Sequence, residues 1–310
     1  MCKNNLLKLT LLPLIVIAAF SGCQRQDKVT HNEKPLIAVS ILPHTWFVFR
    51  IGGERVRTLV LAGQGQNPHN YEPSPRQISG LAGAGAWILS GAEFEISLRP
   101  KIERLFPALP IVDGTAGVSF RRLEAHDDHN DNGGDANGGH DDDPLPHELD
   151  RHTWLGLDPA KLLAAHIRDT LCALDPAGAE FYGENYQSLV QEIDGTFATL
   201  RHDLAPLYGK NIFVYHPSFG YFLDEFGIHQ QAVETGGKSP GPRDLRRLIE
   251  LAREEQPAAI FVQAQFPVSA AQTVADTVGA QVVSLDPLAP NWLENIRYMG
   301  EALKTIIRNQ

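Results

Sequence analysis

Three histidines and one aspartate stand in this sequence at places where metal ligands are expected. His216 and Asp286 each follow a hydrophobic, strand-like run and precede a proline. In an open α/β sheet, ligands bind beyond the carboxyl ends of the strands, so these two side chains are expected to face one crevice. His69 follows another such run, and His152 lies on the polar stretch that leads into a helix. Three imidazoles and one carboxylate make a tetrahedral ligand set that suits Zn²⁺.

The loop that carries His69 is rich in residues that restrict the backbone. It contains three prolines, Pro68, Pro73 and Pro75. Each proline fixes its own φ angle and biases the residue before it toward an extended conformation, so the histidine is expected to be held firmly. Ser74 followed by Pro75 is typical of an N-cap and the first residue of a helix. We therefore expect His69 to lie just before a helix.

The candidate ligands also have purely structural interpretations. His216 could cap a helix, Asp286 could turn the chain, and His152 could continue a flexible loop, but their occurrence together favours a metal site. A zinc hydrolase is one alternative, because three protein ligands and a water molecule form a catalytic site in which Glu72 could be the general base. Asp286 would close that site as a fourth ligand. A surface adhesin or interaction lipoprotein with a structural metal is another alternative.

The first 23 residues have the pattern of a signal peptide. Lys3 and Lys8 precede a 12-residue apolar run, which is too short to span a bilayer and is followed by Ser21, Gly22 and Cys23. This order resembles a bacterial lipoprotein signal, which implies cleavage before Cys23 and acylation of its sulfur as a lipid anchor. The alternative is an ordinary secretory peptide with an incidental cysteine. Residues 24–34 are polar and are expected to form a tether.

The formal charge of −10 is concentrated in one segment, residues 124–150. This segment holds ten Asp and Glu residues and no Lys or Arg, which leaves 27 acids against 27 bases elsewhere. The body is therefore close to neutral and has no basic footprint for nucleic acid. The segment has few apolar residues and is predicted to be a disordered loop. Its histidines could hold divalent metals weakly, as an auxiliary site, or it could be a solvated insert without a specific role. They are His126, His129, His140 and His147.

Strand-like and helix-like patterns alternate along the rest of the chain. The expected strands are residues 36–40, 56–61, 86–90, 110–112, 212–215, 259–262 and 282–285. Such alternation predicts an α/β fold with mainly parallel sheets covered by helices on both faces. Apolar residues recur at helical spacing over residues 177–204, about 40 Å of helix, which is typical of a rigid connector. We expect an N-terminal lobe over 35–175, a connecting helix over 176–206 and a C-terminal lobe over 207–310.

From residue 35 onward the chain resembles the zinc/manganese ABC-transporter solute-binding proteins. Four segments carry the resemblance: Pro68-His69-Asn70-Tyr71-Glu72-Pro73-Ser74-Pro75, His152-Thr153-Trp154-Leu155, His216-Pro217-Ser218-Phe219-Gly220-Tyr221-Phe222 and Leu285-Asp286-Pro287-Leu288. The resemblance implies that His69, His152, His216 and Asp286 bind the ion in a cleft between two lobes joined by one long helix. It also implies a monomeric binding protein, not an enzyme, that delivers the ion to a membrane permease. Asp150-Arg151 replaces the Asp-Pro that usually precedes the second histidine in the family.

The choice of metal depends on the third ligand position. Members that resemble manganese binders tend to have a carboxylate there, and this chain has His216. Imidazole suits zinc, whereas manganese prefers oxygen donors, so zinc is expected and manganese is the alternative. The predicted function is high-affinity zinc binding for an ABC import system. The predicted location is extracytoplasmic, on the periplasmic or outer side of a bacterial membrane.

Overall fold

The computed structural model describes residues 34–123, 149–232, 242–255, 257, 259–266 and 269–308. The predicted signal peptide with Cys23 lies outside the described residues, as does all of the predicted tether except Lys34. So do the acidic loop up to residue 148 and its four histidines, His126, His129, His140 and His147. Among the described residues, no helix is long and apolar enough to cross a membrane.

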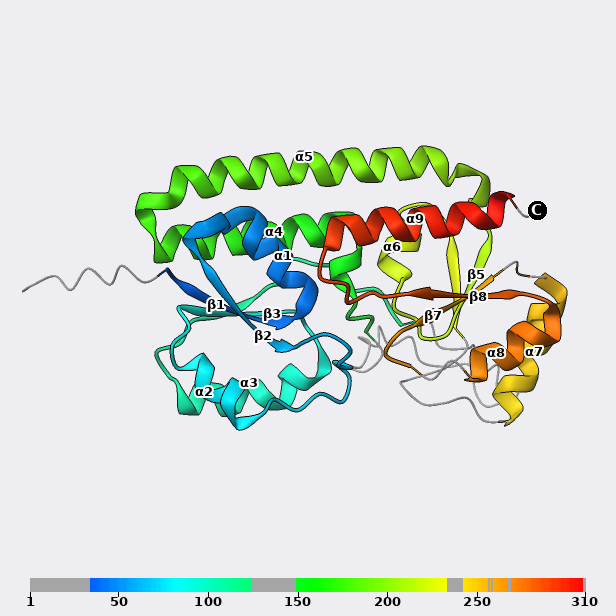
Figure 1. Ribbon diagram of the computed structural model, residues 1–310, viewed down its shortest axis with the longest axis horizontal. Coiled ribbons are helices and arrows are strands. Elements are labelled where there is room, and N and C mark those ends of the chain that lie inside the picture. The colour runs from blue at the N-terminus through cyan, green and yellow to red at the C-terminus, as the bar shows by residue number, and fades with distance from the viewer. Residues whose placement is uncertain are drawn as a thin grey trace, which may run out of the picture. The chain divides into compact units, whose positions relative to one another are not determined.

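The N-terminal half is built on a four-stranded parallel sheet. Its strands are β1 (Leu36–Ile41), β2 (Arg57–Ala62), β3 (Ala86–Leu89) and β4 (Ile111–Asp113), in the order β2-β1-β3-β4. The helices between them are α1 (Leu42–Gly52), α2 (Pro75–Leu81) and α3 (Glu93–Leu105). Figure 1 shows α1 on one face of this sheet and α2 and α3 on the other. The covered faces explain why β1 and β3 read as continuous hydrophobic runs rather than as alternating patterns.

The C-terminal half repeats the same strand order. Its sheet contains β5 (Asn211–Val214), β6 (His229–Ala232), β7 (Ala259–Gln263) and β8 (Gln281–Leu285), paired in parallel as β6-β5-β7-β8. Its helices are α6 (Gly220–Asp224), α7 (Pro242–Glu255), α8 (Ser269–Val278) and α9 (Trp292–Arg308). The sequence did not predict β6, because its residues His-Gln-Gln-Ala contain no hydrophobic run.

One long helix, α5 (Ala179–Asp203), connects the halves. Helix α4 (Leu157–Leu174) is followed by a 3₁₀ turn, Pro176–Gly178, and by α5. The 25 residues of α5 span about 37 Å at 1.5 Å per residue. Helix α5 packs on α1 and α4 from the first half and on α9 from the second, and Figure 1 shows it running along them. The expected fold of two α/β lobes with a long connecting helix is confirmed; the boundaries at residues 175 and 206 stay a prediction.

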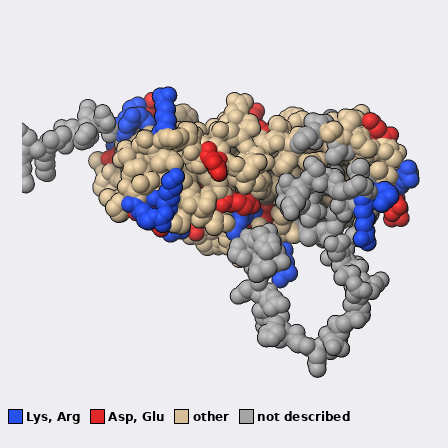
Figure 2. Space-filling view, turned by 90° about the horizontal axis from the view of Figure 1, so that it is seen from below, with Lys and Arg blue, Asp and Glu red and all other residues tan. Residues whose placement is uncertain are grey.

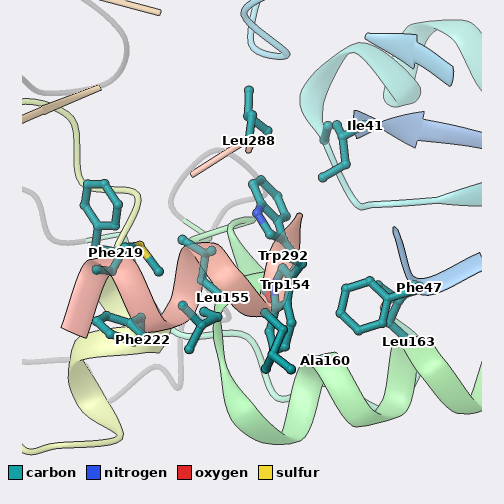
Figure 3. Close-up of a cluster of buried hydrophobic side chains, with 14 of the residues drawn as sticks. Ile41, Phe47, Trp154, Leu155, Ala160, Leu163, Phe219, Phe222, Leu288 and Trp292 are labelled. Carbon is teal, nitrogen blue, oxygen red and sulfur yellow. The ribbon is translucent and has the colours of Figure 1, made fainter. Parts of the chain in front are cut away.

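One hydrophobic cluster extends through both halves. It includes Phe47 of α1, Phe222 of α6 and Trp292 of α9, all of which are buried. Figure 3 shows Trp154 and Trp292 beside each other in this cluster. Burial of large aromatic side chains is worth several kcal/mol in total, so this cluster holds the two halves together beneath the ends of their strands.

The surface of the described residues carries charges of both signs. Figure 2 shows blue Lys and Arg side chains and red Asp and Glu side chains in separate small groups on one face, without a continuous basic surface among the described residues that are visible. This distribution is in line with the near-neutral body expected from the composition.

Candidate metal centre

The loop after β2 places His69 at the end of the N-terminal sheet. Ser74 forms the predicted N-cap of α2, in a capping box whose second member is Gln77. The Tyr71 hydroxyl donates a hydrogen bond of 2.6 Å to the carbonyl of Leu61 in β2. These contacts tie the loop to the helix on one side and to the strand on the other. The predicted N-cap at Ser74 is confirmed, whereas the stiffening of the loop by its prolines stays a prediction.

His152 lies immediately before a 3₁₀ turn, Thr153–Leu155, that is held by the C-terminal half. The indole Nε1 of Trp154 donates to the carbonyl of Pro287 at 2.9 Å. In return, the indole Nε1 of Trp292 donates to the carbonyl of Trp154 at 2.6 Å. Two residues beyond His152, the chain is thus bonded to the segment that follows β8.

His216 follows β5 and is clamped through its backbone. Gln263, at the end of β7, is fully buried. Its Oε1 accepts from the N–H of His216 at 3.2 Å, and its Nε2 donates to the carbonyl of His216 and to Ser218 Oγ. The ring of Phe266 stacks on the His216 ring with centroids 4.7 Å apart. The last residue of β7 therefore fixes the backbone of this histidine, and the segment after β7 packs on its ring.

The three imidazoles converge through their Nε2 atoms. The His69 and His216 Nε2 atoms are 2.9 Å apart, and those of His216 and His152 are 3.3 Å apart. Among the described residues, these three form a group whose potential ligand atoms all lie within 4.8 Å of one another. Zinc–nitrogen bonds of 2.0–2.1 Å at tetrahedral angles put neighbouring nitrogens about 3.3 Å apart. The separation between His216 and His152 therefore matches that of a tetrahedral zinc site, and the separation between His69 and His216 is somewhat shorter.

Two carboxylates hold the opposite ring nitrogens. Asp150 Oδ1 lies 2.8 Å from His152 Nδ1 and 2.9 Å from the backbone N–H of His152. Glu93 Oε2 lies 3.1 Å from His69 Nδ1. A carboxylate at Nδ1 favours the tautomer with its proton on Nδ1, which leaves the Nε2 lone pair for a metal and raises its basicity. Both rings are thus oriented for coordination through Nε2.

Local charges and burial shape the titration of the site. Burial alone would raise the pKa of the Glu93 carboxyl, but its hydrogen bond with His69 and the attraction of that ring lower this pKa to about 2. Burial, followed by repulsion from His152 and His69, lowers the pKa of His216 well below its ordinary value. A neutral imidazole is the form that binds a metal, so the His216 environment favours coordination.

Asp286, the fourth predicted ligand, follows β8 but is not in the three-histidine group. Its Oδ1 accepts from Gln265 Nε2 at 2.7 Å and from the N–H of Leu288 at 2.9 Å. The structure therefore brings together three of the four predicted residues and places the carboxylate in a separate hydrogen-bonded position. Coordination by Asp286 stays a prediction.

A small pocket opens beside the histidines. Glu93, Arg151 and Gln265 line it together with the three histidines, and none of the three was predicted as a site residue from the sequence. Glu93 and Gln265 each come within four residues of a strand end, so the rule that pointed to His216 could have found them. Glu72, the general base of the hydrolase alternative, is exposed and is not among the lining residues.

Two parallel α/β halves and a cluster of three imidazoles drawn from both of them are typical of a metal-binding protein. The chain matches the family described as zinc-uptake complex component A, periplasmic, over residues 37–306, and it belongs to this family. The family comprises metal-binding components of transport systems and not enzymes, which argues against the hydrolase alternative.

Relatives that are named for zinc and for manganese have similar sequence identities to this chain. A crystal structure of ZnuA superimposes with a TM-score of 0.78 at 28% identity, over 88% of this chain and 99% of that one. The high-affinity zinc uptake system protein ZnuA of Yersinia pestis is 26% identical over 262 residues, 81% of this chain and 82% of the relative. The manganese-binding lipoprotein MntA of Halalkalibacterium halodurans is 23% identical over 277 residues, 87% of this chain and 85% of the relative.

Proposed function

We propose that this protein binds one zinc ion between its two lobes and delivers it to the membrane permease of an ABC import system. The observation that carries the proposal is the convergence of three Nε2 atoms from His69, His152 and His216, with separations of 2.9 and 3.3 Å between successive pairs. The ion is the transported substrate, so it must bind reversibly. Ligands from separate lobes suit that purpose, because any movement between the lobes separates the ligands.

In this proposal Asp286 supplies the fourth ligand after a small movement. Its carboxylate follows β8 and is held by Gln265, a residue that lines the pocket. An Asp carboxylate would offset part of the charge of the bound dication and close the tetrahedron. Three imidazole donors favour zinc over manganese. Manganese is the second candidate, because the similar MntA protein is named for it.

We also propose an extracytoplasmic location with a lipid anchor at Cys23. The support is the lipoprotein-like signal at residues 1–23 and the name of the similar MntA protein, which is called a lipoprotein. The protein would act as a monomer on its permease. The histidines of the acidic segment would provide weak auxiliary metal binding.

Titration of the metal-stripped protein tests the proposal. We expect one tight zinc site per chain, measured by calorimetry in competition with a chelator, and weaker binding of manganese. His69→Ala and His216→Ala should each remove the tight site. His202→Ala is the matched control, because the side chain of His202 is 91% exposed and pairs with Asp203 on α5. A wild-type protein without a tight zinc site, or one that binds manganese more tightly, would contradict the zinc proposal.

A further inference from the structure

The guanidinium of Arg121 lies between acidic residues of the two halves. Its Nη1 is 3.0 Å from Asp150 Oδ2, and its Nε is 2.9 Å from Asp224 Oδ2. Asp150 precedes His152 in the N-terminal half, whereas Asp224 ends α6 in the C-terminal half. The Asp150 side chain is fully buried and that of Arg121 is 17% exposed, so solvent screens this contact weakly.

One carboxylate connects this arginine to a metal ligand. Asp150 uses Oδ2 for Arg121 and Oδ1 for the backbone N–H and ring Nδ1 of His152. Removing the arginine would leave Asp150 as a buried charge that still contacts His152, a histidine of the metal site. An unpaired buried charge is strongly unfavourable, so Asp150 and the histidine would have to rearrange.

Tyr221 of α6 joins the same contact from the C-terminal half. Its hydroxyl donates to the carbonyl of Asp150 at 3.0 Å and accepts from the backbone N–H of Arg121 at 3.1 Å. Burial raises the pKa of Tyr221 to about 12, so the hydroxyl keeps its proton and remains a donor. The main chain on both sides of the ion pair is thus bonded to α6.

Gly220 at the start of α6 makes room for the guanidinium. A Cβ atom at this position would lie 1.3 Å from Arg121 Nη1 and 2.9 Å from Asp150 Oδ2. A contact of 1.3 Å cannot exist, so alanine at this position would displace the arginine without removing any charge. The fit of the arginine against α6 therefore depends on the absence of a side chain here.

From these contacts we infer that Arg121 is a positioning residue that couples His152 to the C-terminal half. While Arg121 bridges Asp150 and Asp224, the histidine is held toward His69 and His216. When α6 moves away from the N-terminal half, the bridge opens, His152 loses its fixed orientation and the metal is released. The inference rests on the proposed function, because it concerns the ligand geometry of the same site.

A comparable network elsewhere in the chain provides a matched control. Arg55 Nη2 lies 2.6 Å from Asp175 Oδ2, and the hydroxyl of Tyr182 donates to the same oxygen at 2.7 Å. This network has the same three residue types, but it joins elements of the N-terminal half and α5 and contacts none of the predicted ligands. Loss of this network should lower the free energy of unfolding without changing the rate of zinc release.

The test is the rate of zinc release from the loaded protein into excess chelator. We expect R121Q, D224N and G220A each to accelerate release, with R121Q and G220A giving roughly tenfold, the effect typical of residues that orient metal ligands. D224N should have a smaller effect, because the pair between Arg121 and Asp150 remains. R55Q should release zinc at the wild-type rate. So should G195A, because a Cβ at Gly195 of α5 would meet nothing within 4 Å.

A double variant distinguishes the positioning role of Arg121 from a general loss of rigidity. If Arg121 acts through Asp224, the R121Q/D224N protein should release zinc no faster than R121Q alone. If the increases in release rate of the two single variants multiply in the double variant, the inference is wrong. So would wild-type release rates in R121Q and G220A, whether or not their melting temperatures fall. If R121Q does not fold, the zinc release rates of D224N and G220A still test the inference. Absence of tight zinc binding in the wild-type protein would instead refute the proposed function.

Discussion

The Nε2 atoms of His69 and His216 lie 2.9 Å apart, although 147 positions separate the two residues in the chain. His69 follows β2 of one sheet and His216 follows β5 of the other. Two imidazole nitrogens this close must share a proton or a metal ion, because two N–H groups or two bare lone pairs would repel each other. The site therefore exists only when both halves are folded and in contact.

Zinc should consequently stabilise the folded protein as a whole. A ligand that binds only the folded state adds about 2.7 kcal/mol to the free energy of unfolding at a free concentration 100 times its Kd. Thermal melts of the metal-stripped protein with increasing zinc should show a progressive rise in the melting temperature. In His216→Ala the rise should be absent at the same zinc concentrations, and a rise equal to the wild type's would place the binding elsewhere.

Glu93 is expected to strengthen zinc binding without touching the ion. Its Oε2 lies 3.1 Å from His69 Nδ1, opposite the nitrogen that faces the other histidines. Glu93→Gln keeps the shape of the side chain and removes its charge, so the zinc affinity should fall roughly 10- to 100-fold. Chelator competition on the purified variant measures the loss. Glu103→Gln is the control, because Glu103 pairs with Arg99 on the surface of α3; an unchanged affinity in Glu93→Gln would contradict the prediction.

Asp286 is expected to become a zinc ligand. Asp286→Ala should weaken zinc binding by at least tenfold, because the site would lose its only predicted carboxylate ligand. Asp276→Ala on α8 serves as the control, since this carboxylate accepts a hydrogen bond from Gln272 on the same helix. An unchanged zinc affinity in Asp286→Ala would contradict the prediction and would indicate that water is the fourth ligand.

The sequence singled out three histidines that the structure brings together, although metal binding by them stays a prediction, and it did not identify their surroundings. His69, His152 and His216 could be found because each lies next to a local sequence signal, namely a strand end, a proline or a helix start. Glu93 also follows a strand end, but no local pattern pairs it with His69 or pairs Arg121 with Asp150. Glu93 meets His69 because parallel strands bring their loops to the same edge of a sheet, whereas Arg121 meets Asp150 because the chain forms an antiparallel bridge between Arg122 and Leu149.

The fold was predictable to a similar extent. Hydrophobic runs and helical spacing identified β1 and α5 within two residues at each end. Strand β6 was missed because its side chains do not form an apolar pattern, and its pairing with β5 comes from backbone hydrogen bonds. Local patterns thus located the buried elements, whereas an edge strand with polar residues depends on tertiary contacts.

Gln263 should matter more for stability than its polar side chain suggests. It is fully buried, and its amide bonds both backbone groups of His216. Gln263→Leu would keep the volume and leave a buried N–H and a buried carbonyl without these partners, which should cost about 2–3 kcal/mol or more. Urea unfolding of the metal-stripped protein measures the loss. Gln272→Leu, on the exposed face of α8, should change the free energy of unfolding by less than about 0.5 kcal/mol.

His44 should make the metal-stripped protein less stable in acid. The side chain lies at the start of α1 against Trp154, and among the described residues its Nδ1 has no hydrogen-bond partner. Burial lowers the pKa of His44 from 6.5 to about 3. Below pH 6.5 the unfolded chain therefore takes up a proton that the folded chain refuses until about pH 3. Stability is full above pH 6.5 and falls as the pH decreases, by up to about 1.4 kcal/mol per unit.

His44→Leu should remove this part of the pH dependence. The variant should be at least as stable as the wild type at pH 7, because leucine leaves no buried polar atom unpaired. Its advantage should grow by about 1 kcal/mol between pH 6 and pH 5, as the unfolded wild type becomes protonated. Urea unfolding at both pH values, with the metal removed, measures the difference. Two stability curves that stay parallel over this range would show that His44 takes up its proton in the folded protein as readily as in the unfolded chain.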